Sequence, residues 1–231
     1  MPESISIIPA RRGSKGIPRK NIRLLISKPL IVYTIESAKK SKYLNRIIAS
    51  TEDKEIAEIS KKYGAEVIER PAKFAKDDAP ALPVFQHVVD FLEKNDKYKP
   101  DIIVILQPTS PLREGRDIDR AIEKLLQTNC DSVVSVCEFD HSPYWAYKLN
   151  GDKIEYFVKS KYNTARRQDL PKIYRPNGAV YVTRRKILIE ENRVLGGDTR
   201  AIIMPLERSV DIDTELDFKF AEFLIKEKLN L

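Results

Sequence analysis

The feature that most constrains the fold is a regular alternation of short apolar runs with amphipathic stretches across residues 1–137. The runs are rich in Ile and Val, as buried strands are, and the stretches between them space their apolar residues as helices do. Strands joined by helices indicate a largely parallel sheet covered on both faces, and therefore an α/β fold. We expect strands at residues 5–9, 46–50, 66–69, 101–106 and 132–136, and helices at residues 30–40, 54–63, 83–94 and 117–128.

The alternation breaks at about residue 138. Two runs of alternating apolar and polar residues, 144–149 and 153–158, flank Asn150-Gly151, a pair that favours a tight hairpin turn. A polar, Arg-containing stretch follows. The α/β pattern then resumes with a strand at 178–183, a helix from 184, a strand at 200–205 and a last helix from 214.

This break divides the chain into an α/β domain, residues 1–137 and 177–231, and an inserted excursion, residues 138–176. An exposed hairpin rich in aromatic side chains would leave an unfavourable apolar surface in contact with water, so we expect the excursion to pack on a second subunit. In the alternative, the hairpin folds back on the core of its own chain. The aromatic side chains are Tyr144, Trp145, Tyr147, Tyr156 and Phe157.

The loop after the first strand combines glycines with positive charge and lacks any acidic residue. In open α/β sheets, ligands bind where such a loop leaves the carboxyl end of a strand. Gly13 and Gly16 let successive backbone N–H groups point into one concavity, which suits an anion. Because Arg11, Lys15 and Lys20 add full positive charges, the loop predicts a polyphosphate ligand, and first of all a nucleotide. The alternative is a basic loop that only faces water.

Other patterns exclude several classes of function. The loop is neither G-x-x-x-x-G-K-[ST] nor G-x-G-x-x-G, so a P-loop kinase or a dinucleotide dehydrogenase is not indicated. The 231 residues suffice for one large α/β domain, and 41 Lys and Arg against 34 Asp and Glu give a net charge of +7. This charge suits polyanionic ligands, but the sparse aromatic residues do not support nucleic-acid binding.

The location that we expect is cytoplasmic. The N-terminus lacks a signal-peptide pattern, and the longest purely apolar run, residues 102–106, is too short to cross a membrane. Cys130 and Cys137 lack a metal-binding spacing and are expected to be reduced core residues. Two histidines in the chain do not support a His-based zinc site.

A second candidate motif is the acidic pair Asp211 and Asp213. On an extended segment these side chains point to one side while Ile212 points to the core. Two carboxylates on one side suit Mg²⁺, which completes its shell with water and substrate phosphates. Alternatively, Asp213 or Thr214 caps the last helix. Both readings hold together if Asp213 caps the helix and Asp211 binds the metal.

With both segments in view, the chain resembles the acylneuraminate cytidylyltransferases, or CMP-sialic acid synthetases, which include CMP-legionaminic and CMP-pseudaminic acid synthetases. The resemblance runs almost end to end and rests on several motifs in order. They are I-P-A-R-x-G-S-K-G followed by K-N (8–21), Ser50-Thr51, Arg70-Pro71-Ala72, L-Q-P-T-S-P-L-R (106–113), R-Q-D-L-P (167–171), R-P-N-G-A (175–179) and S-x-D-I-D-T-E-L-D (209–217).

This resemblance implies a Rossmann-like nucleotidyltransferase fold with a mostly parallel sheet and a small hairpin-containing dimerisation subdomain, and hence a homodimer. It also implies an Mg²⁺-dependent reaction. CMP is transferred from CTP to the anomeric hydroxyl of a nine-carbon 2-keto-3-deoxy sugar acid, such as sialic acid or a relative, and pyrophosphate is released.

The resemblance also assigns roles to single residues. Arg70 matches the family's base-binding arginine, which donates to O2 and N3 of cytosine; uracil carries an N–H at N3, so UTP is expected to be rejected. The other expected nucleotide ligands are Arg11, Gly13, Ser14, Lys15, Lys20 and Asn21. Sugar contacts are expected from Gln107, Arg167, Arg175 and Asn177, metal contacts from Asp211 and Asp213, and catalysis from Arg11, Lys15 and Asp211.

Four positions depart from the family pattern. Arg12 replaces a usual glycine, and Pro80 and Ala81 lack hydroxyls that often contact cytosine. Trp145 lies near a position where members specific for sialic acid can carry lysine, so legionaminic or pseudaminic acid is an equal candidate. The competing functions are a 3-deoxy-manno-octulosonate cytidylyltransferase, a sugar-1-phosphate nucleotidyltransferase, and a non-catalytic module that binds nucleotides or nucleic acid.

Overall fold

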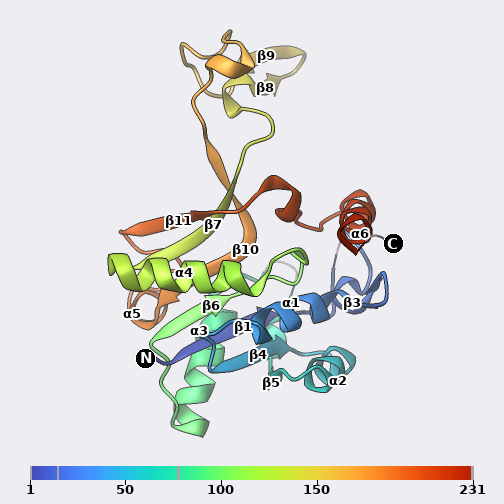
Figure 1. Ribbon diagram of the computed structural model, residues 1–231, viewed down its shortest axis with the longest axis vertical. Helices are drawn as coiled ribbons and strands as arrows, with labels where there is room; N and C mark the ends of the chain where they lie inside the picture. The colour runs from blue at the N-terminus through green and yellow to red at the C-terminus, as the bar shows by residue number, and fades with distance from the viewer. Residues whose placement is uncertain (1, 15, 77–78, 230–231) are drawn as a thin grey trace.

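The computed structural model describes residues 2–14, 16–76 and 79–229. A seven-stranded sheet runs through the body in the order β11-β7-β10-β6-β1-β4-β5 (Figure 1). The strands are β1 (Ser4–Pro9), β4 (Arg46–Thr51), β5 (Glu66–Glu69), β6 (Ile102–Ile105), β7 (Ser132–Glu138), β10 (Tyr174–Arg184) and β11 (Thr199–Ile203). Strand β10 is antiparallel to both β6 and β7, and the other paired neighbours are parallel. The expected mostly parallel α/β sheet is confirmed.

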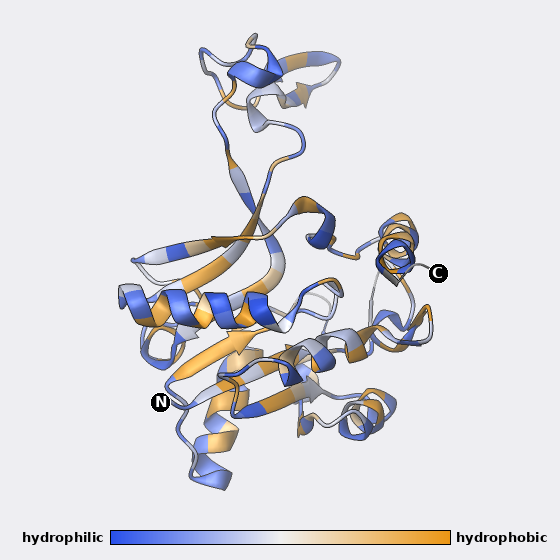
Figure 2. Cartoon of the chain, viewed as in Figure 1, coloured by the Kyte–Doolittle hydropathy of each residue, from blue (hydrophilic) through white to orange (hydrophobic). Residues whose placement is uncertain are grey.

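Helices cover both faces of this sheet, because its central strands are apolar on both sides. In β6, Ile102 and Val104 pack toward α1, α2 and α4, whereas Ile103 and Ile105 pack toward α3 and α5. Figure 2 shows the apolar colour concentrated in the strands and on the helix sides that face them. The helices are α1 (Leu30–Lys39), α2 (Lys54–Lys62), α3 (Leu82–Phe91), α4 (Gly115–Thr128), α5 (Arg185–Ile189) and α6 (Glu215–Leu229).

A third apolar cluster holds α6 beside the sheet rather than on one of its faces. Phe218 and Ile225 of α6 pack against Ile17 and Leu25 of the N-terminal segment and against Ile212. The segment around the acidic pair therefore lies between the N-terminal segment and helix α6. This cluster also confirms that Ile212, which is fully buried, points to the core.

Some element boundaries differ from the expectation for local physical reasons. Helix α4 begins at Gly115 rather than 117, because the side chain of Glu114 accepts from the backbone of Asp117 and that of Asp117 accepts from the backbone of Glu114, which caps the first turn. A two-stranded ribbon, β2 (Leu24–Leu25) with β3 (Lys28–Pro29), was not expected. It is too short to leave a pattern in the sequence.

The excursion is an arm that stands away from the body (Figure 1). Strand β10 begins at Tyr174 rather than at the expected residue 178, because Tyr174 still pairs with Glu138 of β7. At the tip, β8 (Tyr147–Asn150) and β9 (Lys153–Tyr156) form the expected hairpin.

Several apolar side chains of the arm face outward, whereas Tyr144, Trp145 and Tyr156 are partly buried. Leu149, Ile154 and Phe157 are 73%, 60% and 68% exposed. The hairpin therefore does not fold back on the chain's own core, and its packing on a second subunit stays a prediction. In the described ranges no helix combines the length and apolar character needed to cross a membrane, and Cys130 and Cys137 are free and buried.

Candidate active site

The segments singled out in the sequence converge at the carboxyl ends of β1, β4 and β6. The backbone N–H of Ala10 donates to the carbonyl of Ser50 at 3.0 Å, which joins the first loop to the end of β4. The N–H of Ile212 donates to the carbonyl of Thr109 at 2.9 Å. This bond joins the segment that carries the acidic pair, residues 209–217 and here called the acidic segment, to the loop after β6. Two segments far apart in the sequence thus flank one edge of the sheet, as ligand sites in open α/β sheets do.

The first loop is pressed against the acidic segment at Gly16. A Cβ atom at this position would lie 2.0 Å from the carbonyl oxygen of Asp213, so only glycine fits. The side-chain amide of Asn21, 9% exposed, donates to the carbonyl of Arg11 at 2.9 Å and holds the loop in shape. Lys15 lies outside the described residues, Gly13 is exposed and Ser14 is partly exposed.

Lys20 joins the two segments electrostatically. Its ammonium group donates to the carbonyl of Ile212 at 2.6 Å and to the carboxylate of Asp213 at 3.1 Å. Its side chain is 11% exposed, whereas that of Asp213 is 76% exposed. The residue expected to hold phosphate therefore lies beside the carboxylates expected to hold metal.

Gly178 brings the candidate metal and sugar residues together. Its φ is +74°, and its missing Cβ would lie 3.2 Å from both Asp211 Oδ2 and Gln107 Oε1, and 3.3 Å from the Ser110 hydroxyl. Asp211 and Gln107 were predicted to be site residues from different motifs, and the structure places both against one glycine. Ser110 and Gly178 belong to two of the motifs that carry the resemblance, but no role was predicted for either.

Asp211 has the properties of an incomplete ligand site. Its Oδ1 is buried and lacks a hydrogen-bond partner among the described residues. Burial raises the pKa of Asp211, and the charge of Asp213 raises it further, while Thr109 and Lys20 oppose the rise. A cation would relieve this unfavourable burial.

Asp213 does not cap α6. The carboxylate of Asp217 accepts from the backbone N–H of Thr214 at 2.7 Å, and the Thr214 hydroxyl accepts in return from the N–H of Asp217 at 3.3 Å. Thr214 and Asp217 therefore cap the helix, and the Asp213 side chain pairs with Lys20 instead.

Within the described ranges, no group of three or more His, Cys, Asp and Glu side chains could hold a metal. An Mg²⁺ ion that keeps water and substrate phosphates needs only one or two carboxylates. The donor set of Asp211 and Asp213 fits that requirement, with Asp211 as the better placed of the two.

A cleft of about 580 Å³ opens beside Asp211 and is also lined by Asp140, Arg175 and Phe220. Arg175 thus borders the same space as Asp211, as its predicted role in sugar binding requires. Arg167 lies on the arm, exposed, with its guanidinium 3.5 Å from the carbonyl of Asp140. It borders the cleft only through that residue.

Asn177 is buried, with 1% exposure, and both ends of its amide are engaged inside the protein. Its oxygen accepts from the Ser135 hydroxyl at 2.6 Å, and its nitrogen donates to the Ser209 hydroxyl at 2.9 Å. These bonds join β7, β10 and the acidic segment. The structure thus gives Asn177 a positioning role, and its predicted contact with a sugar has no support in these bonds.

Arg70 is also buried, 5% exposed, and donates to the carbonyl of Ser50 at 2.8 Å. Burial lowers its pKa, the charge of Glu52 opposes this, and that of Arg11 adds to it. Arg70 therefore lies within electrostatic reach of the first loop, as a base-binding residue must. Of the departures, Pro80 and Ala81 are exposed, as is Arg12.

Arg113 is a site residue that the sequence analysis did not assign. Its guanidinium donates to the carbonyls of Gln107, at 3.2 Å, and Ala179, at 2.8 Å. Burial lowers its pKa to about 9. Arg113 ends the quoted L-Q-P-T-S-P-L-R motif, which is the one signal in the sequence that pointed to it.

The chain is similar to known proteins over almost its whole length. The sequence pattern described as cytidylyltransferase matches residues 5–228. Among similar proteins, post-translational flagellin modification protein B of Campylobacter coli is 38% identical, covering 99% of this chain and 97% of that protein. Two proteins of Campylobacter jejuni are also similar. A pseudaminic acid cytidylyltransferase is 34% identical (97% of each chain), and a CMP-N,N'-diacetyllegionaminic acid synthase is 36% identical (99% of this chain, 97% of that one).

A solved structure shares the fold. The CTP complex of a CMP:2-keto-3-deoxy-manno-octonic acid synthetase matches with a TM-score of 0.73 at 18% identity, over 98% of this chain and 99% of that one. At that identity the match concerns the fold alone.

The first prediction concerns Gly178, for which Gly151 is a matched control. Both have positive φ, but nothing lies within 4 Å of a Cβ at Gly151. Gly151→Ala should cost at most about 1–2 kcal/mol of unfolding free energy. Gly178→Ala should cost about 1 kcal/mol more, because its Cβ crowds Asp211 and Gln107. Urea unfolding of both variants measures the difference, and equal losses would contradict the crowding.

The second prediction concerns the charge of Asp211. A raised pKa means that the folded state binds the proton more tightly than the unfolded state, so wild-type stability falls as pH rises through the carboxyl range. Without metal, Asp211→Asn should therefore be more stable than wild type at pH 7, and the gain should shrink toward pH 4. Thermal unfolding across this range tests it. The comparison variant is Asp213→Asn, which relieves Asp211 of a nearby charge but also removes the ion pair with Lys20, so its gain should be smaller. A destabilised Asp211→Asn at pH 7 would refute the prediction.

Proposed function

Because the chain belongs to the cytidylyltransferase family, we propose that it transfers CMP from CTP to the anomeric hydroxyl of a nine-carbon 2-keto-3-deoxy sugar acid. The single observation that carries the proposal is Gly178, which brings Asp211 and Gln107 together beside a cleft that Arg175 also lines. The names of the two Campylobacter jejuni relatives support an acid sugar of the pseudaminic or legionaminic type as the acceptor.

The reaction is an in-line displacement at the α-phosphorus of CTP. The sugar's anomeric oxygen attacks, the bond to the bridging oxygen breaks, and pyrophosphate leaves. Such chemistry depends on positioning and on neutralising charge. We assign the β and γ phosphates to Arg11, Lys15 and Lys20, with backbone groups of the glycine-containing loop, and Asn21 keeps that loop in shape.

We propose that Asp211, assisted by Asp213, binds Mg²⁺. When bound, the ion would neutralise phosphate charge and acidify the attacking hydroxyl. The buried, unpartnered Oδ1 of Asp211 supports this assignment. Lys20 then has a second task, since it holds the backbone between the two carboxylates and places a positive charge beside them.

We propose that Arg70 reads the base and that Arg175 and Gln107 hold the acid sugar. A guanidinium can grip both oxygens of the sugar carboxylate, and Arg175 borders the cleft from β10. Arg70 offers donors that suit cytosine and not uracil, and its burial makes an unpaired donor costly, by about 1–3 kcal/mol.

We further propose a homodimer in which the arm packs on a second subunit and Arg167 acts there. The outward apolar side chains Leu149, Ile154 and Phe157 support this packing. The contact of Arg167 with the carbonyl of Asp140 in its own chain is at the limit of hydrogen bonding, 3.5 Å, and leaves Arg167 exposed. A cytoplasmic location and the absence of a nucleic-acid ligand stay predictions.

Turnover with purified protein tests the function. Pyrophosphate release should require CTP, Mg²⁺ and a nine-carbon 2-keto acid sugar, and Asp211→Asn should lose nearly all of it while staying folded. UTP should not replace CTP. Faster release with 3-deoxy-manno-octulosonate, or with a sugar 1-phosphate, would transfer the assignment to that competing function.

Subunit mixing tests the role of the arm. Arg167→Ala should bind CTP normally but turn over poorly, because only the acid sugar loses a contact. Co-refolding it with Asp211→Asn should restore part of the activity if Arg167 serves the partner, since some sites then hold both intact residues. Unmixed variants carried through the same refolding are the control. A monomer in solution, or no recovery despite demonstrated subunit exchange, would place Arg167 in its own subunit's site.

A further inference from the structure

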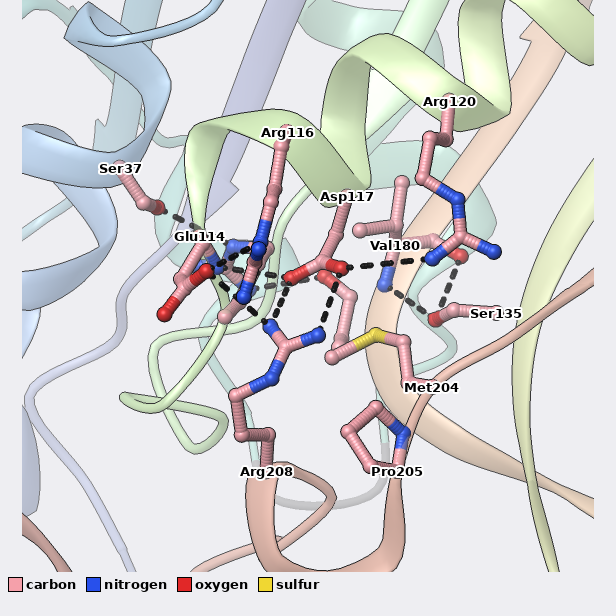
Figure 3. Close-up of polar contacts among 12 residues, drawn as sticks. Ser37, Glu114, Arg116, Asp117, Arg120, Ser135, Val180, Met204, Pro205 and Arg208 are labelled. Carbon is pink, nitrogen blue, oxygen red and sulfur yellow. Dashed lines mark hydrogen bonds and ion pairs between the residues drawn. The ribbon is translucent and has the colours of Figure 1, made fainter.

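A buried ion pair lies next to the acidic segment and has no part in the roles assigned so far. Asp117, in the first turn of α4, is fully buried. Its carboxylate accepts a hydrogen bond from each terminal nitrogen of Arg208, at 2.5 and 3.1 Å (Figure 3). The Arg208 side chain is 14% exposed. A two-point, largely buried contact of this kind fixes direction as well as distance.

The first turn of α4 fixes the position of the Asp117 carboxylate. Its carboxylate accepts from the backbone N–H of Glu114 at 2.9 Å and lies at the positive end of the helix dipole. Arg120, which belongs to α4 itself, approaches Oδ1 of the same carboxylate at 3.9 Å, and its side chain is half exposed (Figure 3). Of these two arginines, Arg208 comes from outside the helix, so it is the one that ties another segment to this carboxylate.

The segment that it ties leads directly to Asp211. Arg208 ends the short turn η6 (Leu206–Arg208), and Asp211 follows three residues later. Between them, the Ser209 hydroxyl donates to the carbonyl of Pro205 at 2.8 Å and accepts from Asn177. Beyond Asp211, the N–H of Ile212 is held by the carbonyl of Thr109. Asp211 is thus carried on a short span fixed at both ends, and Arg208 is its outer anchor.

We propose that Arg208 is a positioning residue for Asp211: through Asp117 it sets where the metal-site carboxylate lies against Gly178 and Gln107. The inference rests on the proposed function, because it takes Asp211 to be the Mg²⁺ ligand. Arg208 touches neither metal nor nucleotide in this scheme. It acts on the reaction only through the path of the backbone from 208 to 211.

A purely structural ion pair makes a different prediction from a positioning one. Substitution of Arg208 would lower thermal stability in both cases, because Asp117 would be left buried without its partner. Only loss of a positioning contact would weaken metal binding in the protein that remains folded. Removal of groups that orient a metal ligand typically lowers metal affinity by about 10–100-fold.

The experiment measures Mn²⁺ binding to the full chain with CTP present, by electron paramagnetic resonance, together with the Mg²⁺ dependence of turnover. Arg208→Gln should weaken Mn²⁺ binding about 10-fold and raise the Mg²⁺ requirement equally, with CTP affinity in the absence of metal unchanged. Arg208→Lys, which keeps one charged contact, should lie between it and wild type. The matched control is Arg120→Gln, which removes a charge from the same carboxylate and a hydrogen bond to the carbonyl of Ile203 on β11, but no contact of residues 208–212; it should bind Mn²⁺ as wild type does.

The outcomes separate the inference from the proposed function. If wild type itself binds no Mn²⁺ in the presence of CTP, the metal assignment fails. If wild type binds it and Arg208→Gln and Arg208→Lys bind it equally well, with only their melting temperatures lowered, the positioning role is refuted. Arg208→Lys provides the same test if Arg208→Gln does not fold.

Discussion

The ammonium group of Lys20 donates to the carbonyl of Ile212, 192 residues further along the chain, and the candidate site depends on this bond. It joins the first loop to the acidic segment at the point where Gly16 lets the two backbones touch. Without that approach, the residues proposed to bind phosphate and those proposed to bind metal would belong to separate surfaces. The apolar cluster of Ile17, Ile212 and Phe218 stabilises this contact, because these side chains bury each other.

The second constraint is the cost of keeping polar groups buried around this contact. Arg70, Arg113 and Asp117 are each 5% exposed or less, and Asp211 is held where burial opposes its charge. Such groups destabilise a fold unless each finds partners, and most here are held by backbone carbonyls or by one another. Among the described residues, Oδ1 of Asp211 and one terminal nitrogen of Arg113 lack a partner. For Asp211, this is the trade of stability for function that the proposed metal site would require.

The order of strands and helices could be predicted from the sequence because apolar periodicity reports on burial, and burial dominates in this sheet. The site could be predicted only where a motif is local. The sequence suggests that Gly16 provides backbone flexibility for an anion-binding loop. In the structure, a glycine is required there because the carbonyl of Asp213 leaves no room for a Cβ atom. The sequence gives no prediction for Gly178, because its need for open space depends on residues from two other segments, the loop after β6 and the acidic segment.

Arg208 and Arg113 show the same limit. Each acts through partners far away in the sequence, and single arginines in polar loops resemble surface charges. Asn177 was expected to touch a sugar, but its amide joins three segments of the protein. Without coordinates, a side chain that builds a site cannot be distinguished from one that touches the ligand, because both kinds are polar and lie in the same motifs.

The arm has a consequence for how such a chain can vary. The sheet closes beneath it, where Glu138 pairs with Tyr174 and the N–H of Phe139 donates to the carbonyl of Ile173 at 3.1 Å. The register of β7 against β10 is therefore set below the arm and not by its length. Lengthening a closed loop costs little, about 0.6 kcal/mol for each doubling. Insertions, deletions or exchange of the tip can thus remodel what the arm touches while Arg175 and Gly178, a few residues further along β10, keep their places.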